Sequence, residues 1–252
     1  MSWTVVSFIS LAIFAVVFAA AFAGSGALVD VLRRRQVLDH PNKRSSHVAP
    51  TPRGGGIAVV GVLLAVWAGI AFLAPGIFPH PLSVPFPAMV LVLFCALGLA
   101  IISWIDDLKG LTPLTRLVLQ FAAAIICLDA LPVGPSGAVL VFQGLLPAAA
   151  DHVAAALIWI WFLNLFNFMD GIDGITGVEA ASVGGGVFVV ALFAGGAQDW
   201  ALFGLSAAGA ACGFLCWNWD PAKLFIGDVG SVPLGFLLGW LLLGLAAMGY
   251  WA

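Results

Sequence analysis

Long apolar runs alternate with short polar connections along the chain, and this pattern predicts a bundle of membrane-spanning helices. A helix needs about 20 mostly apolar residues to cross a bilayer, and most of the runs approach that length. The fifth run is shorter and leads directly into a polar stretch. We therefore expect about eight helical spans, at 3–28, 57–73, 88–105, 114–131, 152–163, 177–194, 200–217 and 232–251. The expected fold class is an all-α polytopic membrane protein.

The composition supports this expectation and excludes several classes of protein. The chain is 63% hydrophobic and 8% charged, with a mean hydropathy of +1.14, whereas about 25% of the residues of a soluble domain are charged. It has neither a basic domain nor an aromatic-basic face, so we expect no nucleic-acid partner. The four cysteines lie in apolar runs without metal-ligand spacing, which indicates packing residues.

The polar connections predict a membrane orientation. With eight spans, alternate connections share one face of the membrane, and every Lys and Arg lies in or beside one set of them. The positive-inside rule makes that face cytoplasmic and leaves the N-terminus outside. The connections of this set are 33–56, 106–113, 164–177 and 218–230. They also contain Asp106, Asp107, Asp170, Asp173 and Asp228, whereas Asp129, Asp151 and Asp199 fall on the opposite face and are interpreted as interfacial helix ends.

Residues 164–175 form the most polar stretch that directly follows an apolar run. Asp170 and Asp173 are each followed by glycine, and on a continuing helix the two carboxylates would share one face. The glycines instead favour a turn or broken helix where the backbone approaches a ligand closely. Carboxylates at a membrane edge are costly unless they are paired, solvated or bound to a cation. We interpret the stretch as a metal or polar-ligand site. The simpler alternative is a solvated helix end that is rich in turn-forming residues.

Asp106 and Asp107 close the third apolar run. Adjacent residues on a helix point about 100° apart, so one carboxylate can face a metal and the other a proton or a second ligand. A solvated helix end is again the alternative. Acidic residues at a helix C-terminus oppose the helix dipole, however, and this unfavourable placement indicates a function.

Two further stretches are suited to anions. Asp228 precedes the last apolar run, where Asp228 or Ser231 would cap a helix whose N-terminus favours a phosphate. Phe225 offers an aromatic surface for a base, although a membrane-facing phenylalanine is commoner. The loop 39–56 offers cations, hydroxyls and three glycines whose N–H groups can approach an anion. A flexible positive-inside loop would explain its cations equally well.

Four motifs stand in order across residues 39–231. The first loop reads D-H-P-N, R-S-S-H and P-T-P-R-G-G-G; Asp106–Asp107, N-x-x-N-x-x-D-G-x-D-G from Asn164, and F-I-G-D-x-G-S from Phe225 follow. Together they resemble the polyprenyl-phosphate sugar-1-phosphate transferases, the MraY/WecA superfamily. The sequence of the first loop is most similar to that of the WbpL-type branch, which starts O-antigen synthesis.

The resemblance implies transfer of a sugar 1-phosphate from a UDP-linked N-acetylated sugar to undecaprenyl phosphate at the bacterial inner membrane. UMP would be released, and Mg²⁺, or Mn²⁺ in its place, would be required. A divalent cation lowers the repulsion between a phosphate nucleophile and a pyrophosphate. The implied catalytic residues are Asp106, Asp107 and Asp228, and the implied metal ligands are Asp228, Asp107 and Asp170. The implied substrate-binding residues are Asn167, Asp170, Asp173, Phe225, Lys43, Arg44, His47 and Arg53.

Two other functional classes stay open at the level of sequence. Broken helices bearing Asp and Asn are typical of ion-coupled transporters, although here the carboxylates lie in connections and no repeat is visible. The resemblance also implies that family members continue into a histidine-containing loop and further helices. We therefore expect residues 1–252 to form a single membrane domain that lacks them, and a non-catalytic remnant that binds lipid phosphate is the second alternative. Neither the sugar nor a homodimer is fixed by the sequence.

Overall fold

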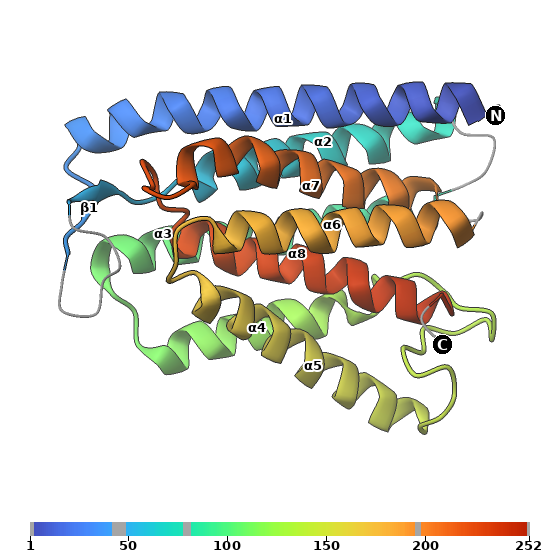
Figure 1. Cartoon of the computed structure of the whole chain (residues 1–252). Helices are drawn as coiled ribbons and strands as arrows, with labels where there is room; N and C mark the ends of the chain where they lie inside the picture. The colour runs from blue at the N-terminus through green and yellow to red at the C-terminus, as the bar shows by residue number, and fades with distance from the viewer. Residues whose placement is uncertain (1–2, 42–48, 78–81, 195–197, 251–252) are drawn as a thin grey trace.

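The computed structural model describes residues 3–41, 49–77, 82–194 and 198–250, and within them the chain is almost entirely helical (Figure 1). Two short strands, β1 (Leu38–Asp39) and β2 (Thr51–Pro52), pair antiparallel. The helices are α1 (Trp3–Arg34), α2 (Gly56–Ile77), α3 (Phe86–Lys109), α4 (Pro113–Leu128), α5 (Ala148–Met169), α6 (Ile175–Ala194), α7 (Gln198–Asn218) and α8 (Asp228–Ala247). The prediction of an all-α polytopic membrane protein is confirmed; the strand pair was not expected.

Seven of the described helices are long and apolar enough to cross a membrane. The remaining helix, α4, has 16 residues and is about 24 Å long, less than the roughly 30 Å of a bilayer core. Several helices extend beyond the predicted spans at their polar ends: α3 continues to Lys109 and α5 to Met169. Hydropathy marks the part of a helix that lies in lipid, whereas hydrogen bonding continues the helix past that limit.

Helix α8 lies at the centre of the bundle, and almost all of its residues are buried. Its glycines let neighbouring helices approach closely: a Cβ at Gly239 would lie 2.6 Å from the Trp159 ring, and one at Gly244 would lie 2.1 Å from Trp200. The indole N–H groups of Trp159 and Trp200 donate to backbone carbonyls of α8. Small residues at helix contacts are the usual basis of packing in membranes. They fix the axis that carries Asp228 at its first residue.

The connections predicted to share one face do lie together, at the left end of the bundle in Figure 1. Backbone hydrogen bonds join them: Gly54 and Gly55 donate to the carbonyl of Phe225, and Gly56 donates to that of Ile226. The prediction that these glycine N–H groups are available to an anion is therefore wrong. Gly56 instead permits a close helix contact, since a Cβ there would lie 2.1 Å from Cα of Gly230.

Candidate active site

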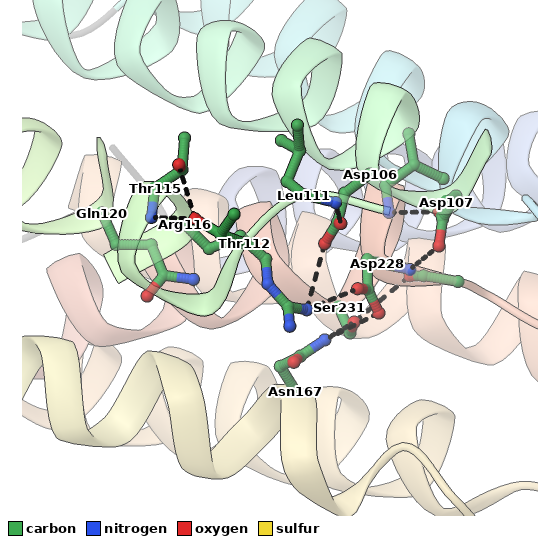
Figure 2. Close-up of polar contacts among 12 residues, drawn as sticks. Asp106, Asp107, Leu111, Thr112, Thr115, Arg116, Gln120, Asn167, Asp228 and Ser231 are labelled. Carbon is green, nitrogen blue, oxygen red and sulfur yellow. Dashed lines mark hydrogen bonds and ion pairs between the residues drawn. The ribbon is translucent and has the colours of Figure 1, made fainter. Parts of the chain in front are cut away.

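The two adjacent aspartates at the end of α3 point to different partners, as their helical spacing predicted (Figure 2). Asp106 turns toward the α3–α4 connection, where its Oδ1 accepts from the Leu111 N–H. Its Oδ2 forms an ion pair with Arg116 of α4 at 3.0 Å. Asp107 turns toward α8 instead. The two adjacent aspartates therefore connect the end of α3 to two different helices, α4 and α8.

Asp107 caps the N-terminus of α8. Its Oδ1 accepts from the Asp228 N–H at 3.2 Å and its Oδ2 from the Val229 N–H at 2.9 Å. The side chain is 1% exposed and forms an ion pair with Arg53. Capping by Asp228 or Ser231 was predicted, but neither side chain caps the helix, whose N-cap residue is Gly227. A carboxylate from another helix satisfies these N–H groups, which frees Asp228 for other contacts.

Asp228 is the most accessible of the three clustered carboxylates, with 21% of its side chain exposed, against 6% for Asp106 and 1% for Asp107. Arg53 approaches its Oδ1 at 3.4 Å and Arg116 its Oδ2 at 3.5 Å. With the carboxylates ionised, three negative charges face two guanidinium groups. The cluster therefore has a net negative charge, which favours an additional cation.

Asn167 joins this cluster from α5. Its amide donates to Asp228 Oδ1 at 3.2 Å and to the Ser231 hydroxyl at 2.7 Å (Figure 2). Ser231 in turn donates to the carbonyl of Gly227 at 3.2 Å. One face of Asp228 is thus fixed by α5 and by its own helix.

The turn between α5 and α6 holds the other two predicted aspartates, and the predicted break in the helix is confirmed. Asp170 ends α5 and accepts a hydrogen bond from the Thr176 hydroxyl. Burial raises the pKa of Asp170 to about 7, with the charge of Asp228 adding to the rise and the Thr176 bond opposing it. Asp173 accepts from the Ala222 N–H at 2.8 Å. It therefore ties this turn to the α7–α8 connection.

The predicted ligand residues of the loops are only partly within the described chain. Phe225 lies beside Arg53 in a parallel β-bridge, and its N–H donates to the Pro52 carbonyl at 2.8 Å. This bridge fixes Arg53 next to Asp107. Lys43, Arg44 and His47 lie outside the described residues.

Arg116 is the main site residue that sequence reasoning missed. The sequence pattern indicates only that it is one of the basic residues of one membrane face. Thr112 caps α4, so Arg116 lies near the N-terminus of that helix, where a positive charge opposes the helix dipole. This unfavourable placement, like that of Asp106 at a helix C-terminus, is the signal in the sequence that points to Arg116.

An open groove of about 630 Å³ begins at the charged cluster. It runs between α4 and α5, and Val232 of α8 contributes to its lining. Arg116 and Asn167 stand at its polar end. Its remaining lining residues are Pro113, Leu117, Gln120, Trp161, Asn164, Leu165 and Phe168. Most of these side chains are apolar, so the groove connects a charged site to a surface suited to a hydrocarbon chain.

The geometry is matched by relationships to known proteins. Residues 89–246, more than half of the chain, match glycosyl transferase family 4. The chain belongs to this family. The matched region contains Asp106, Arg116, Asn167 and Asp228, so the family includes the helices that build the cluster. Membership of this family supports the predicted assignment to the MraY/WecA-like superfamily, whereas the assignment to the WbpL-type branch stays a prediction.

Several family members are similar over most of the chain. The phospho-N-acetylmuramoyl-pentapeptide-transferase of Shouchella clausii is 30% identical over 241 residues, covering 86% of this chain and 69% of its own length. The decaprenyl-phosphate N-acetylglucosaminephosphotransferase of Mycolicibacterium smegmatis is 33% identical over 221 residues, covering 79% of this chain and 51% of its own length. The chain thus spans between about half and about two thirds of these relatives.

Proposed function

We propose that the chain carries the catalytic core of a polyprenyl-phosphate N-acetylhexosamine-1-phosphate transferase. It would transfer a sugar 1-phosphate from a UDP-sugar to undecaprenyl phosphate and release UMP. One observation carries the proposal: the cluster of Asp106, Asp228, Arg53 and Arg116 opens directly onto an apolar groove between two helices. A lipid with a phosphate at one end needs these two surfaces side by side.

The acceptor lipid would lie in the groove between α4 and α5. Its isoprenoid chain would contact Leu117, Trp161 and Phe168, of which the latter two are largely exposed along the groove. Its phosphate would reach Arg116, whose guanidinium group already bridges two carboxylates. Guanidinium groups bind phosphate oxygens as readily as carboxylates, so the phosphate can replace one of these carboxylates as a partner.

The donor would bind on the loop side of Asp228. Arg53 would hold its pyrophosphate, and Phe225, on the adjacent strand bridge, would stack on the base. Asn167, Asp170 and Asp173 lie at the end of α5 and in the following turn, where they would contact the nucleotide or the sugar. Lys43, Arg44 and His47 belong to the same loop as Arg53 and are proposed as further phosphate contacts.

Magnesium fits this set of donors. No group of three His, Cys, Asp or Glu side chains with metal-site geometry occurs among the described residues. Mg²⁺ is usually held by one or two carboxylates together with substrate phosphates rather than by a complete protein cage. Asp228 is the first candidate ligand because it is the most accessible of the clustered aspartates; Asp107 and Asp170 are candidates for supporting it. When bound, Mg²⁺ would neutralise charge on the pyrophosphate and the leaving UMP.

The chain's own residues would mainly orient the two substrates. A phosphate oxygen of the lipid forms a bond to the sugar-linked phosphorus, and the bond from that phosphorus to the UMP oxygen breaks. A phosphate monoester has its second pKa near about 6, so the nucleophile is largely ionised at neutral pH without a strong base. Asp106 would hold Arg116 beside this phosphate and accept any remaining proton. We further propose that this end of the bundle is cytoplasmic, because the basic residues gather there.

The test is UMP release by the purified protein with undecaprenyl phosphate, Mg²⁺ and a panel of UDP-N-acetyl sugars. We expect release that requires the lipid and the cation, and the preferred sugar would decide between the O-antigen branch and the activities of the named relatives. Binding of the lipid without release by any sugar would favour a non-catalytic remnant instead. Solute flux into vesicles, without release of UMP, would favour a transporter.

A further inference from the structure

A second polar contact joins α4 to α5 deeper in the bundle than the charged cluster. The Asn164 amide donates to Gln120 Oε1 at 2.8 Å and to the carbonyl of Ile160 at 2.9 Å. Gln120 is only 5% exposed, although it lies in the middle of an apolar helix. A buried glutamine in a membrane bundle is costly unless it is hydrogen-bonded, so this pair specifies one contact between the two helices.

The pair shares its helix faces with the site. Gln120 follows Arg116 by four residues on α4, and Asn164 precedes Asn167 by three on α5, so on each helix the two residues lie on one face. Arg116 and Asn167 both contact Asp228. The Gln120–Asn164 bond therefore lies one turn below the point where the same two faces meet Asp228.

Helix α4 needs such a fixed point. It packs against α3 and α5, and it is the shortest of the described helices. Hydrophobic attraction does not hold helices together in lipid, where packing and interhelical hydrogen bonds do so. Since Arg116 reaches the cluster from α4, any lateral shift of α4 moves its guanidinium group relative to Asp106 and Asp228.

We propose that Gln120 is a positioning residue for the transfer reaction. Through its bond to Asn164 it sets the separation of α4 and α5, and so places Arg116 and Asn167 on either side of Asp228. The bond also lies in the groove wall where the charged end changes into the apolar part. It thereby limits how deep the phosphate of the lipid descends. This inference rests on the proposed function, because it concerns the placement of the acceptor phosphate.

The first test compares kinetics in variants of nearly equal volume. Gln120→Met removes the hydrogen bond, and we expect kcat to fall about 10- to 100-fold, since small misplacements of reacting groups have such effects. KM for the UDP-sugar should stay close to that of the wild type. The exchange Gln120→Asn with Asn164→Gln keeps the combined length of the pair and should restore much of kcat. Gln143→Met is the matched control, because Gln143 donates to the Ala246 and Ala247 carbonyls at the other end of the bundle; its kcat should not change.

The second test does not depend on turnover. Arg116→Met is combined with Gln120→Met, and thermal unfolding is measured for both single variants and for the pair. If Gln120 places Arg116, the two changes are coupled, and Arg116→Met destabilises the protein less when Gln120 is already replaced. Additive effects would overturn the inference even if no donor sugar is turned over. An active wild type whose Gln120→Met variant keeps full kcat would overturn it as well, while leaving the proposed function intact.

Discussion

Buried aspartates lie at both ends of the bundle, but their partners differ. At the end opposite the site, Asp151 accepts from the Val141 and Phe142 N–H groups at 3.0 and 2.9 Å. Asp199 accepts from the N–H and the hydroxyl of Ser83, both at 2.8 Å. Both residues are in the first turn of a helix, where the helix dipole favours a negative charge. The partners of these carboxylates are backbone N–H groups and a hydroxyl of the protein itself, not cationic side chains.

At the site end, the partners are arginines that a phosphate can also bind. Asp106 and Asp228 share Arg116, and Asp228 also approaches Arg53. Asp107 combines the two types, since it accepts two backbone N–H groups and pairs with Arg53. Burial therefore does not by itself distinguish a functional aspartate from a structural one. The distinction lies in whether its partners are exchangeable.

The largest expected effect is at Asp228. Asp228→Asn keeps the shape of the side chain but removes its charge. Under the proposed function, UMP release should fall by at least about 100-fold, the loss expected when a group that stabilises a transition state is removed. Asp199→Asn is the control at the opposite end and should leave kcat of the folded protein unchanged. If Asp199→Asn abolished turnover as completely as Asp228→Asn, the contrast between the two ends would be wrong.

Substitution of Arg116 tests how the acceptor lipid binds. Binding would depend either on direct contact with this arginine or on the general positive charge at this end of the bundle. Arg116→Gln should raise KM for undecaprenyl phosphate by about 10-fold or more, because a hydrogen bond to a charged group contributes about 1.5–3 kcal/mol. Lys109→Gln removes an equal charge from the end of α3 and should change KM little. Equal effects of the two variants in steady-state assays at low salt would show that long-range charge, and not contact, governs lipid binding.

Asp151 represents the aspartates whose partners are fixed groups of the protein itself, and its substitution tests whether their role is structural. Asp151→Asn places an amide N–H against one of two backbone donors, and the resulting loss of a buried hydrogen bond should lower stability by about 1–3 kcal/mol. Denaturation in detergent measures this loss, and kcat per folded molecule should stay at the wild-type value. Asp107→Asn should show both a loss of stability and a loss of turnover. A purely kinetic effect at Asp107 would place it with Asp228 and not with Asp151.

The sequence predicted the architecture well because the length of an apolar run is directly a physical constraint in a membrane. It also predicted the separate directions of Asp106 and Asp107 and a helix break within residues 164–175, since helical spacing and glycine are local properties. It did not predict which side chain caps α8. That cap comes from Asp107, a residue distant in sequence, and depends on the packing of α3 against α8.

Arg116 and Gln120 were missed for a related reason. Both lie on one face of a helix whose apolar pattern predicts only a membrane span, and their roles depend on which helix lies opposite. The glycines of the first loop were misinterpreted because a short strand bridge to Phe225, invisible in the sequence pattern, occupies their N–H groups. Contacts between segments distant in the chain are the part that local patterns do not determine.

The smallest expected effect is a pH dependence at the α5–α6 turn, where burial raises the pKa of Asp170. The unfolded chain loses this proton near its ordinary pKa of 3.8, whereas the folded chain holds it to about 7. Between these values the folded state binds more protons, so stability falls as pH rises. The contribution is complete below the ordinary pKa and is lost once pH passes the folded value.

Asp170→Asn removes this titration. In EDTA, we expect the stability of the wild type to fall relative to that of Asp170→Asn as pH is raised from about 5 to about 8, because only the wild type acquires a buried charge. Thermal unfolding of both proteins at several pH values measures the difference. A constant difference between wild type and Asp170→Asn would mean that Asp170 is already ionised at pH 5, and therefore that a positive partner reaches it when the protein is in solution.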